Sequence, residues 1–106
     1  MGKRVLTDDN FDAELAACQT PYMVEFFATW CGHCKRMAPV IDELAAEFDG
    51  KITIFLADVD AAVKKTDVFN VCATPTMILF KNGRQIQTFT GEKDKEILKT
   101  ALLALL

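Results

Sequence analysis

The hydrophobic positions of the chain follow two kinds of pattern, and the first is a short, almost unbroken apolar run. Residues 22–28, YMVEFFA, are interrupted only by Glu25, and residues 52–60, ITIFLADVD, show the same character. Runs of this length are typical of strands that are buried on both faces of a sheet. We therefore predict two central strands of an α/β sheet.

The second pattern is helical spacing. It predicts helices within residues 7–18, 35–48 and 93–106, and a short helical segment extends from about residue 61 to residue 69. In the three longer segments, the apolar residues that recur three or four positions apart are Phe11, Leu15 and Cys18; Met37, Ile41, Leu44, Ala45 and Phe48; and Ile97, Ala101, Leu102 and Leu105. Pro39 lies inside the second segment and predicts a kink there.

The order of these elements predicts the topology. We interpret the first part of the chain as β, α, β, α, β, α, although no residues are assigned to the first strand, and this order favours parallel pairing with crossover helices. The segments TMILF (76–80) and QIQTF (85–89) then flank KNGR (81–84), and Asn-Gly is the strongest short signal of a hairpin. We expect an α/β fold with a central mixed sheet of about five strands, covered on both faces by about four helices.

Length and charge narrow the class of protein. The 106 residues suit a single domain spanning residues 1–106, and 12 Lys and Arg against 15 Asp and Glu give a net charge of −3. Such a chain lacks the basic surface that attracts nucleic acid or anionic lipid. Asp8 and Asp9 stand where a signal peptide would need its apolar run, and no stretch approaches the roughly 20 apolar residues of a membrane span. We expect a monomeric, cytoplasmic protein.

The candidate chemistry lies in Cys31 and Cys34, which are three positions apart. Cys31 follows a predicted buried strand, and Cys34 falls in the first turn of the next helix, where unpaired N–H groups and the helix dipole favour a thiolate. Two sulfurs at this spacing can close a disulfide and reopen it. The pattern therefore predicts a two-electron redox pair rather than a structural disulfide.

A zinc site is the main alternative for these two cysteines. A closed structural site needs four ligands, and only Cys31, Cys34 and His33 are at hand in the sequence. We therefore predict no metal site, and a metal-binding role remains an alternative.

Three neighbours of the pair are further candidates. His33 is either a solvated loop residue or an imidazole that stabilises the neighbouring thiolate, which would make the disulfide a stronger oxidant. Glu25 is either a carboxylate at a strand edge or a buried acid that exchanges a proton with the resolving thiol. Trp30 is either a core residue or a contact platform at the mouth of the loop, which its position favours.

The other two cysteines have weaker claims. Cys18 lies on the apolar side of the first predicted helix, and we interpret it as a small buried hydrophobe without chemistry. Cys72 lies in the loop VCATPT, where its thiol is either exposed or packed.

Over essentially its full length the sequence resembles the thioredoxin family. The matching segments, in order, are VEFFATWCGHCK for the active site, AP for the kinked helix, ATPT for the proline loop, FKNG for the hairpin and TGE for the glycine turn. The ordered set is far more specific than any one of its members.

The resemblance implies a thioredoxin fold and a role for each matching residue. Cys31 would be the attacking cysteine and Cys34 the resolving one, and Glu25 matches the buried acid of the family. The Thr74–Pro75 peptide bond would be cis and would face the cysteines. The residues implied to line the groove for an extended substrate segment are Trp30, Gly32, Thr74, Pro75 and Gly91.

Four positions depart from the common thioredoxin pattern and affect the expected direction of electron flow. Gly32-His33 is the spacing found in protein disulfide isomerase domains, where thioredoxins usually have Gly-Pro. Glu25 stands where Asp is usual, Phe27 where Trp is common and Leu56 where Lys is common. Cys72 lies just before the proline loop, where some thioredoxins have a regulatory cysteine.

We therefore expect a protein-disulfide oxidoreductase that reduces substrate proteins. It would hold no cofactor and would receive electrons from NADPH through thioredoxin reductase. One alternative is an oxidase or isomerase with the same fold. Alternatives of another class are a non-catalytic module that binds peptides and a metal-binding carrier.

Overall fold

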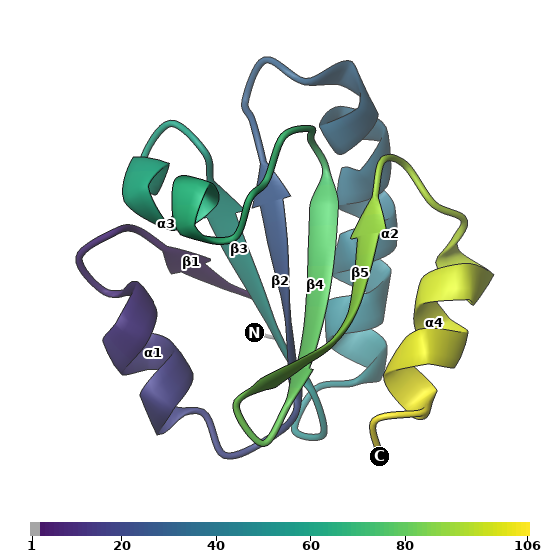
Figure 1. The fold of residues 1–106 in the computed structure, drawn as a ribbon. Coiled ribbons are helices and arrows are strands. Elements are labelled where there is room, and N and C mark those ends of the chain that lie inside the picture. The colour runs from purple at the N-terminus through teal and green to yellow at the C-terminus, as the bar shows by residue number, and fades with distance from the viewer. Residues whose placement is uncertain (1–2) are drawn as a thin grey trace.

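The computed structural model describes residues 3–106, which contain one five-stranded sheet and four helices (Figure 1). In chain order the elements are β1 (Lys3–Leu6), α1 (Phe11–Ala17), β2 (Tyr22–Phe27), α2 (Gly32–Glu47), β3 (Thr53–Asp58), α3 (Val63–Val68), β4 (Thr76–Lys81), β5 (Arg84–Thr90) and α4 (Lys95–Leu103). None of the helices within this range is long and apolar enough to cross a membrane.

The sheet is mixed, with the strand order β1-β3-β2-β4-β5. β3 pairs in parallel with β1 and β2, whereas β4 pairs antiparallel with β2 and β5. β2 is thus the central strand, and its residues are buried except for half-buried Phe27. This confirms the predicted central strand and explains its almost unbroken apolar run.

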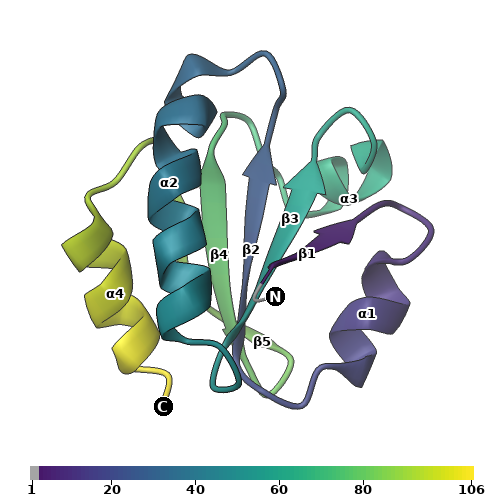
Figure 2. The same ribbon diagram turned by 180° about the vertical axis from the view of Figure 1, so that it is seen from behind.

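Helices cover both faces of the sheet. α2 and α4 lie on one face, while α1 and α3 lie on the other (Figures 1 and 2). The face under α2 and α4 buries an aliphatic cluster that includes Ile41, Leu44 and Leu98. The opposite face buries an aromatic cluster in which Phe11 packs against Phe26 and Phe69. The predicted fold class, with a mixed five-stranded sheet flanked by four helices, is confirmed.

The predicted hairpin is present between β4 and β5. Asn82 and Gly83 form its turn with φ angles of 54° and 76°. Both angles are positive, which a two-residue turn of type I′ requires and which Asn and Gly tolerate best. The first strand of the predicted order is β1, to which the sequence pattern had assigned no residues.

The predicted apolar face of the last helix was wrong at one residue. Ile97 is 47% exposed, whereas its neighbour Leu98 is fully buried. Leu98, Leu102 and Leu105 also recur at i, i+4 and i+7, so two registers fit the sequence. The observed register also allows Lys95 to pair with Glu43 and Glu47 of α2.

The strand register brings distant segments to one edge of the sheet. Phe26, next to the end of β2, pairs with Thr76 at the start of β4, and Thr76 pairs with Thr90 at the end of β5. The loop that leads into α2, the loop before β4 and the turn after β5 therefore meet at this edge.

Candidate active site

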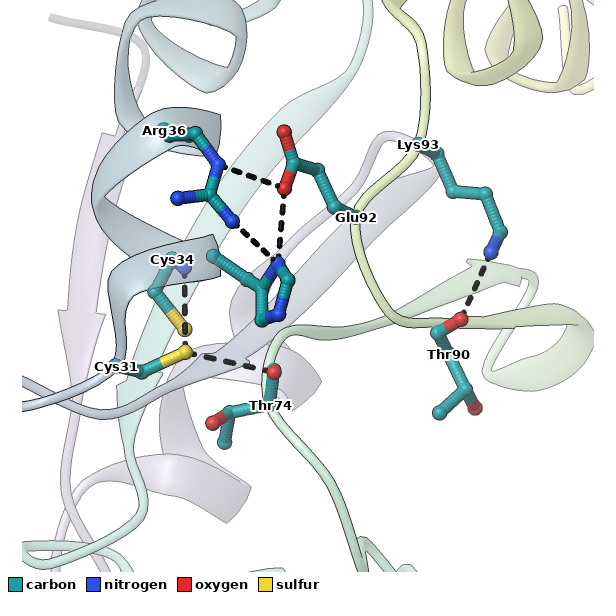
Figure 3. Close-up of polar contacts among 8 residues, drawn as sticks. Cys31, Cys34, Arg36, Thr74, Thr90, Glu92 and Lys93 are labelled. Atoms are coloured by element: carbon teal, nitrogen blue, oxygen red, sulfur yellow. Dashed lines mark hydrogen bonds and ion pairs between the residues drawn. The ribbon is translucent and has the colours of Figure 1, made fainter.

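Cys31 and Cys34 lie where the loop after β2 enters α2 (Figure 3). Cys31 caps the N-terminus of the helix, and its Sγ accepts a hydrogen bond from the backbone N–H of Cys34 at 3.2 Å. Both residues are free thiols and are buried, with exposed fractions of 7% and 6%. The Cys31 sulfur thus lies at the N-terminus of α2, and a helix N-terminus stabilises negative charge.

Hydrogen bonds make Cys31 the more acidic thiol of the two. Burial by itself would raise the pKa of Cys31, but hydrogen bonds from the side chains of Cys34 and Thr74 and from the backbone of Cys34 and His33 outweigh it. The pKa of Cys31 is therefore lowered from the ordinary cysteine value of 9.0. Since the thiolate is the nucleophile, Cys31 is the thiol that is prepared to attack.

Cys34 has the opposite character. Burial, followed by the hydrogen bond with Cys31, raises the pKa of Cys34 to about 11. Its thiol therefore stays protonated at neutral pH and needs a base before it can act as a nucleophile. The pair therefore consists of one thiol with a lowered pKa, Cys31, and one with a raised pKa, Cys34.

Glu25 lies on β2 with an exposed fraction of 4%. It lines a cavity of about 110 Å³ together with Cys34 and with the α2 residues Ala38 and Ile41. One water molecule needs about 10–15 Å³ of such volume, so the cavity can hold water between the carboxyl group and the thiol. This arrangement can carry a proton from Cys34 to Glu25.

The loop before β4 faces Cys31. The Thr74–Pro75 peptide bond is cis, as the resemblance implies, and the Cys31 thiol donates to the Thr74 carbonyl at 3.4 Å (Figure 3). The backbone N–H of Gly91 donates to the Pro75 carbonyl at 2.8 Å. Gly91 has a φ angle of 89°, a conformation that favours glycine. Thr74 thus contacts Cys31, and Gly91 is joined to the same loop through Pro75, while Gly32 is the exposed first residue of α2.

Trp30 is 69% exposed next to Cys31 and is not a core residue. Its indole N–H donates to the carboxylate of Asp60 at 3.0 Å. The sequence did not single out Asp60, which follows β3. Because β2 and β3 are parallel neighbours, the residues that follow them meet at one edge of the sheet, and this was the signal that could have indicated the pair.

The imidazole of His33 makes a contact different from the expected one. Its Nδ1 lies 3.0 Å from Glu92 Oε1 and 2.7 Å from Arg36 Nη2, and Arg36 Nε donates to the same Oε1 at 3.0 Å (Figure 3). His33 reaches the Cys31 sulfur through its backbone N–H instead. The i, i+3 spacing of His33 and Arg36 could have indicated their contact, whereas Glu92 joins them only through the fold.

The two remaining cysteines lie outside this site. Cys18 packs against the aromatic cluster but is half-buried rather than buried as expected, and its thiol makes hydrogen bonds with Thr20. Cys72 is exposed, which decides between the two alternatives left by the sequence. Within residues 3–106, no three His, Cys, Asp or Glu side chains are grouped so that they could hold a metal ion.

Comparison with known proteins places these features in a family. Residues 2–104 match the family model described as Thioredoxin. The chain is 41% identical over 95 residues to a thioredoxin of Mycolicibacterium smegmatis, a match that covers 88% of this chain and 85% of that protein.

Two longer proteins are similar to a comparable degree. The chain is 38% identical over 98 residues to a chloroplastic M-type thioredoxin of Zea mays, covering 92% of this chain and 59% of the maize protein. It is 40% identical over 93 residues to a bifunctional thioredoxin reductase/thioredoxin of Mycobacterium leprae, covering 88% of this chain and 20% of that protein.

Proposed function

The chain belongs to the thioredoxin family and is a thioredoxin-type disulfide oxidoreductase with the pair Cys31 and Cys34, and on this premise we propose that it reduces disulfide bonds of substrate proteins. The observation that carries the proposal is the unequal acidity of the two thiols. A thiolate at Cys31 and a protonated thiol at Cys34 are the state from which a disulfide is attacked.

The proposed reaction has two exchange steps. The Cys31 thiolate attacks a substrate disulfide, the substrate S–S bond breaks, and the departing sulfur takes up a proton. Cys31 is now joined to the substrate in a mixed disulfide. Glu25 accepts the Cys34 proton through the shared cavity, and the Cys34 thiolate attacks the Cys31 sulfur. The mixed-disulfide bond breaks, and the second substrate sulfur leaves as a thiolate that takes up a proton. The substrate leaves as a dithiol, two electrons have passed to it, and Cys31 and Cys34 are joined by a disulfide.

We further propose that an extended substrate segment lies against the loop before β4. Trp30 offers an exposed ring, and Gly32 and Gly91 add no side chains of their own. The Thr74 carbonyl, next to Pro75, already contacts the Cys31 sulfur. Backbone groups and an aromatic ring suit segments of varied sequence.

The electron supply is a further part of the proposal. Thioredoxin reductase, using NADPH, would return the disulfide to the dithiol, and the protein itself would hold no cofactor. The bifunctional protein of Mycobacterium leprae, whose name joins both activities, supports this pairing. We propose that the protein works as a monomer in the cytoplasm, where net reduction is the expected direction.

The Gly32-His33 spacing favours a second candidate, an oxidase or isomerase, because isomerase domains share it. The reduction potential decides between them and is measured by equilibration with glutathione after Cys18 and Cys72 are replaced by Ser. A potential below the cytosolic glutathione poise of about −220 to −260 mV supports the reductase. A potential well above it contradicts the reductase and favours the second candidate.

Variants of the two cysteines test the reaction itself. We expect Cys31→Ser to abolish reduction of a disulfide-bonded test protein and Cys34→Ser to accumulate the mixed disulfide. Cys72→Ser is the control, because it removes an exposed thiol outside the site and should leave the rate unchanged. Full activity of Cys31→Ser would refute the assignment and leave a binding module or metal carrier as the alternative.

A further inference from the structure

Glu92 connects the turn after β5 to the first turn of α2 (Figure 3). A single carboxylate oxygen, Oε1, lies 3.0 Å from His33 Nδ1 and 3.0 Å from Arg36 Nε. Hydrogen bonds from His33 and then from Arg36 lower the pKa of Glu92, so this group is a carboxylate at neutral pH. It is the anion next to two groups that carry or can carry positive charge.

The two contacts of His33 Nδ1 are alternatives. A guanidinium group only donates hydrogen bonds, so Arg36 can bond to Nδ1 only when that nitrogen carries a lone pair. When Nδ1 carries a proton, it donates to Glu92 instead. Arg36 therefore bonds to the imidazole when Nδ1 carries a lone pair, and Glu92 bonds to it when Nδ1 carries a proton.

Positive charge in the first turn of α2 would add to the helix dipole near Cys31. A more stabilised Cys31 thiolate favours the dithiol form over the disulfide, and the disulfide then becomes a stronger oxidant. Lys35 adds a further positive charge in the same turn, and three other charged side chains near this edge make contacts of their own. Asp60 accepts from Trp30, Asp58 accepts from the Asp60 backbone, and Lys93 donates to the Thr90 carbonyl.

We propose that Glu92 is a positioning residue for disulfide exchange: it holds His33 and Arg36 together, offsets their positive charge, and keeps the Cys31–Cys34 disulfide a weaker oxidant. This inference rests on the proposed function, because it explains how a reductase can carry the Gly32-His33 spacing. Glu92 acts through its two neighbours and does not touch the sulfur atoms.

Glu92→Gln tests the inference in protein that carries Cys18→Ser and Cys72→Ser. We expect the equilibrium with glutathione to shift about threefold toward the dithiol, which corresponds to about 14 mV for a two-electron couple. The pKa of Cys31, measured from the pH dependence of its alkylation, should fall. Both effects should shrink in 1 M salt, because the carboxylate is partly exposed.

Two comparisons separate this role from a merely structural one. Glu14→Gln is the matched control, since Glu14 pairs with Arg4 at 3.7 Å and lies on α1, which covers the other face of the sheet. The second comparison repeats Glu92→Gln in protein with His33→Ala and Arg36→Gln. There we expect less than half of the shift, because the groups through which Glu92 acts are gone.

The inference is overturned by a shift no larger than that of Glu14→Gln, by a shift toward the disulfide, or by an equal shift without His33 and Arg36. These outcomes are independent of the proposed function. The potential of the parent protein tests the direction of electron flow, whereas the difference between parent and variant tests Glu92.

Discussion

At the scale of single residues, the reactivity of Cys31 and Cys34 depends on which of the two thiols loses its proton more easily. Cys31 and Cys34 lie in the same helical turn, yet hydrogen bonds lower one pKa and burial raises the other. The Cys31 sulfur accepts from backbone N–H groups at the start of α2, while Cys34 lines the cavity shared with Glu25. A side chain three positions away therefore has a different chemical task.

This difference predicts two separate titrations. Alkylation of Cys31 by iodoacetamide should reach half its maximal rate below pH 9.0, and alkylation of Cys34 should do so near pH 11. The sign follows because only the thiolate reacts, so a lowered pKa moves the transition to lower pH and a raised pKa moves it higher. Mass spectrometry of each cysteine peptide measures both rates. Coincident transitions would contradict the assignment of attacking and resolving thiols.

Glu25→Ala should slow resolution more than it weakens substrate binding. Loss of the carboxylate removes the proposed acceptor of the Cys34 proton, and general-base contributions are typically 10²–10⁴-fold. We expect the lifetime of the mixed disulfide at neutral pH to lengthen at least about tenfold. Glu43→Gln, on the exposed side of α2, is the control. Equal lifetimes in the parent and in Glu25→Ala would refute the role of Glu25.

At the scale of elements, α4 is held by one apolar face. Leu98 is fully buried in the aliphatic cluster, whereas adjacent Ile97 is 47% exposed. We expect Leu98→Ala to lower the free energy of unfolding by about 2–5 kcal/mol and Ile97→Ala to lower it by less than about 1 kcal/mol. Urea unfolding followed by circular dichroism measures both. Similar losses would contradict this single buried face, and a larger loss for Ile97→Ala would favour the register in which Ile97 faces the core.

Helices and strands could be predicted from the sequence where burial or a turn produces a recognisable pattern of consecutive residues. The central strand is apolar because helices cover both its faces, and the hairpin is marked by Asn82 and Gly83. β1 is an edge strand that begins with Lys3 and Arg4, so it lacks a comparable run. The face of α4 was ambiguous because Ile97 and Leu98 both fit helical spacing.

The candidate site also has a part that could be predicted from the sequence and a part that could not. Cys31, Cys34 and Glu25 could be found because they share one strand–helix segment with a characteristic spacing. The contacts of Trp30 with Asp60 and of His33 with Glu92 span 30 and 59 residues. No local pattern encodes such contacts, because they depend on how the turns at one edge of the sheet meet.

At the scale of the whole molecule, the redox state of one turn is linked to the stability of the fold. A thermodynamic cycle links two free energies. The free energy by which folding stabilises the disulfide equals the amount by which the disulfide raises the free energy of unfolding. If the protein is a reductant, its oxidised form should resist urea more than its reduced form. Each 30 mV of difference in potential between the folded and unfolded chain corresponds to about 1.4 kcal/mol.

Parallel urea titrations of both forms, with Cys18 and Cys72 replaced by Ser, measure this difference. A Cys31→Ser, Cys34→Ser variant is the control, since added reductant should not change its unfolding. Greater stability of the reduced form would contradict the proposed direction of electron flow.

The exposed position of Trp30 has a consequence for spectroscopy. It is the only tryptophan in the sequence, it precedes Cys31, and it is 69% exposed. Its fluorescence should therefore respond weakly to unfolding and strongly to a peptide docked against Cys31. Trp30 fluorescence should therefore allow peptide binding to be followed without an added label.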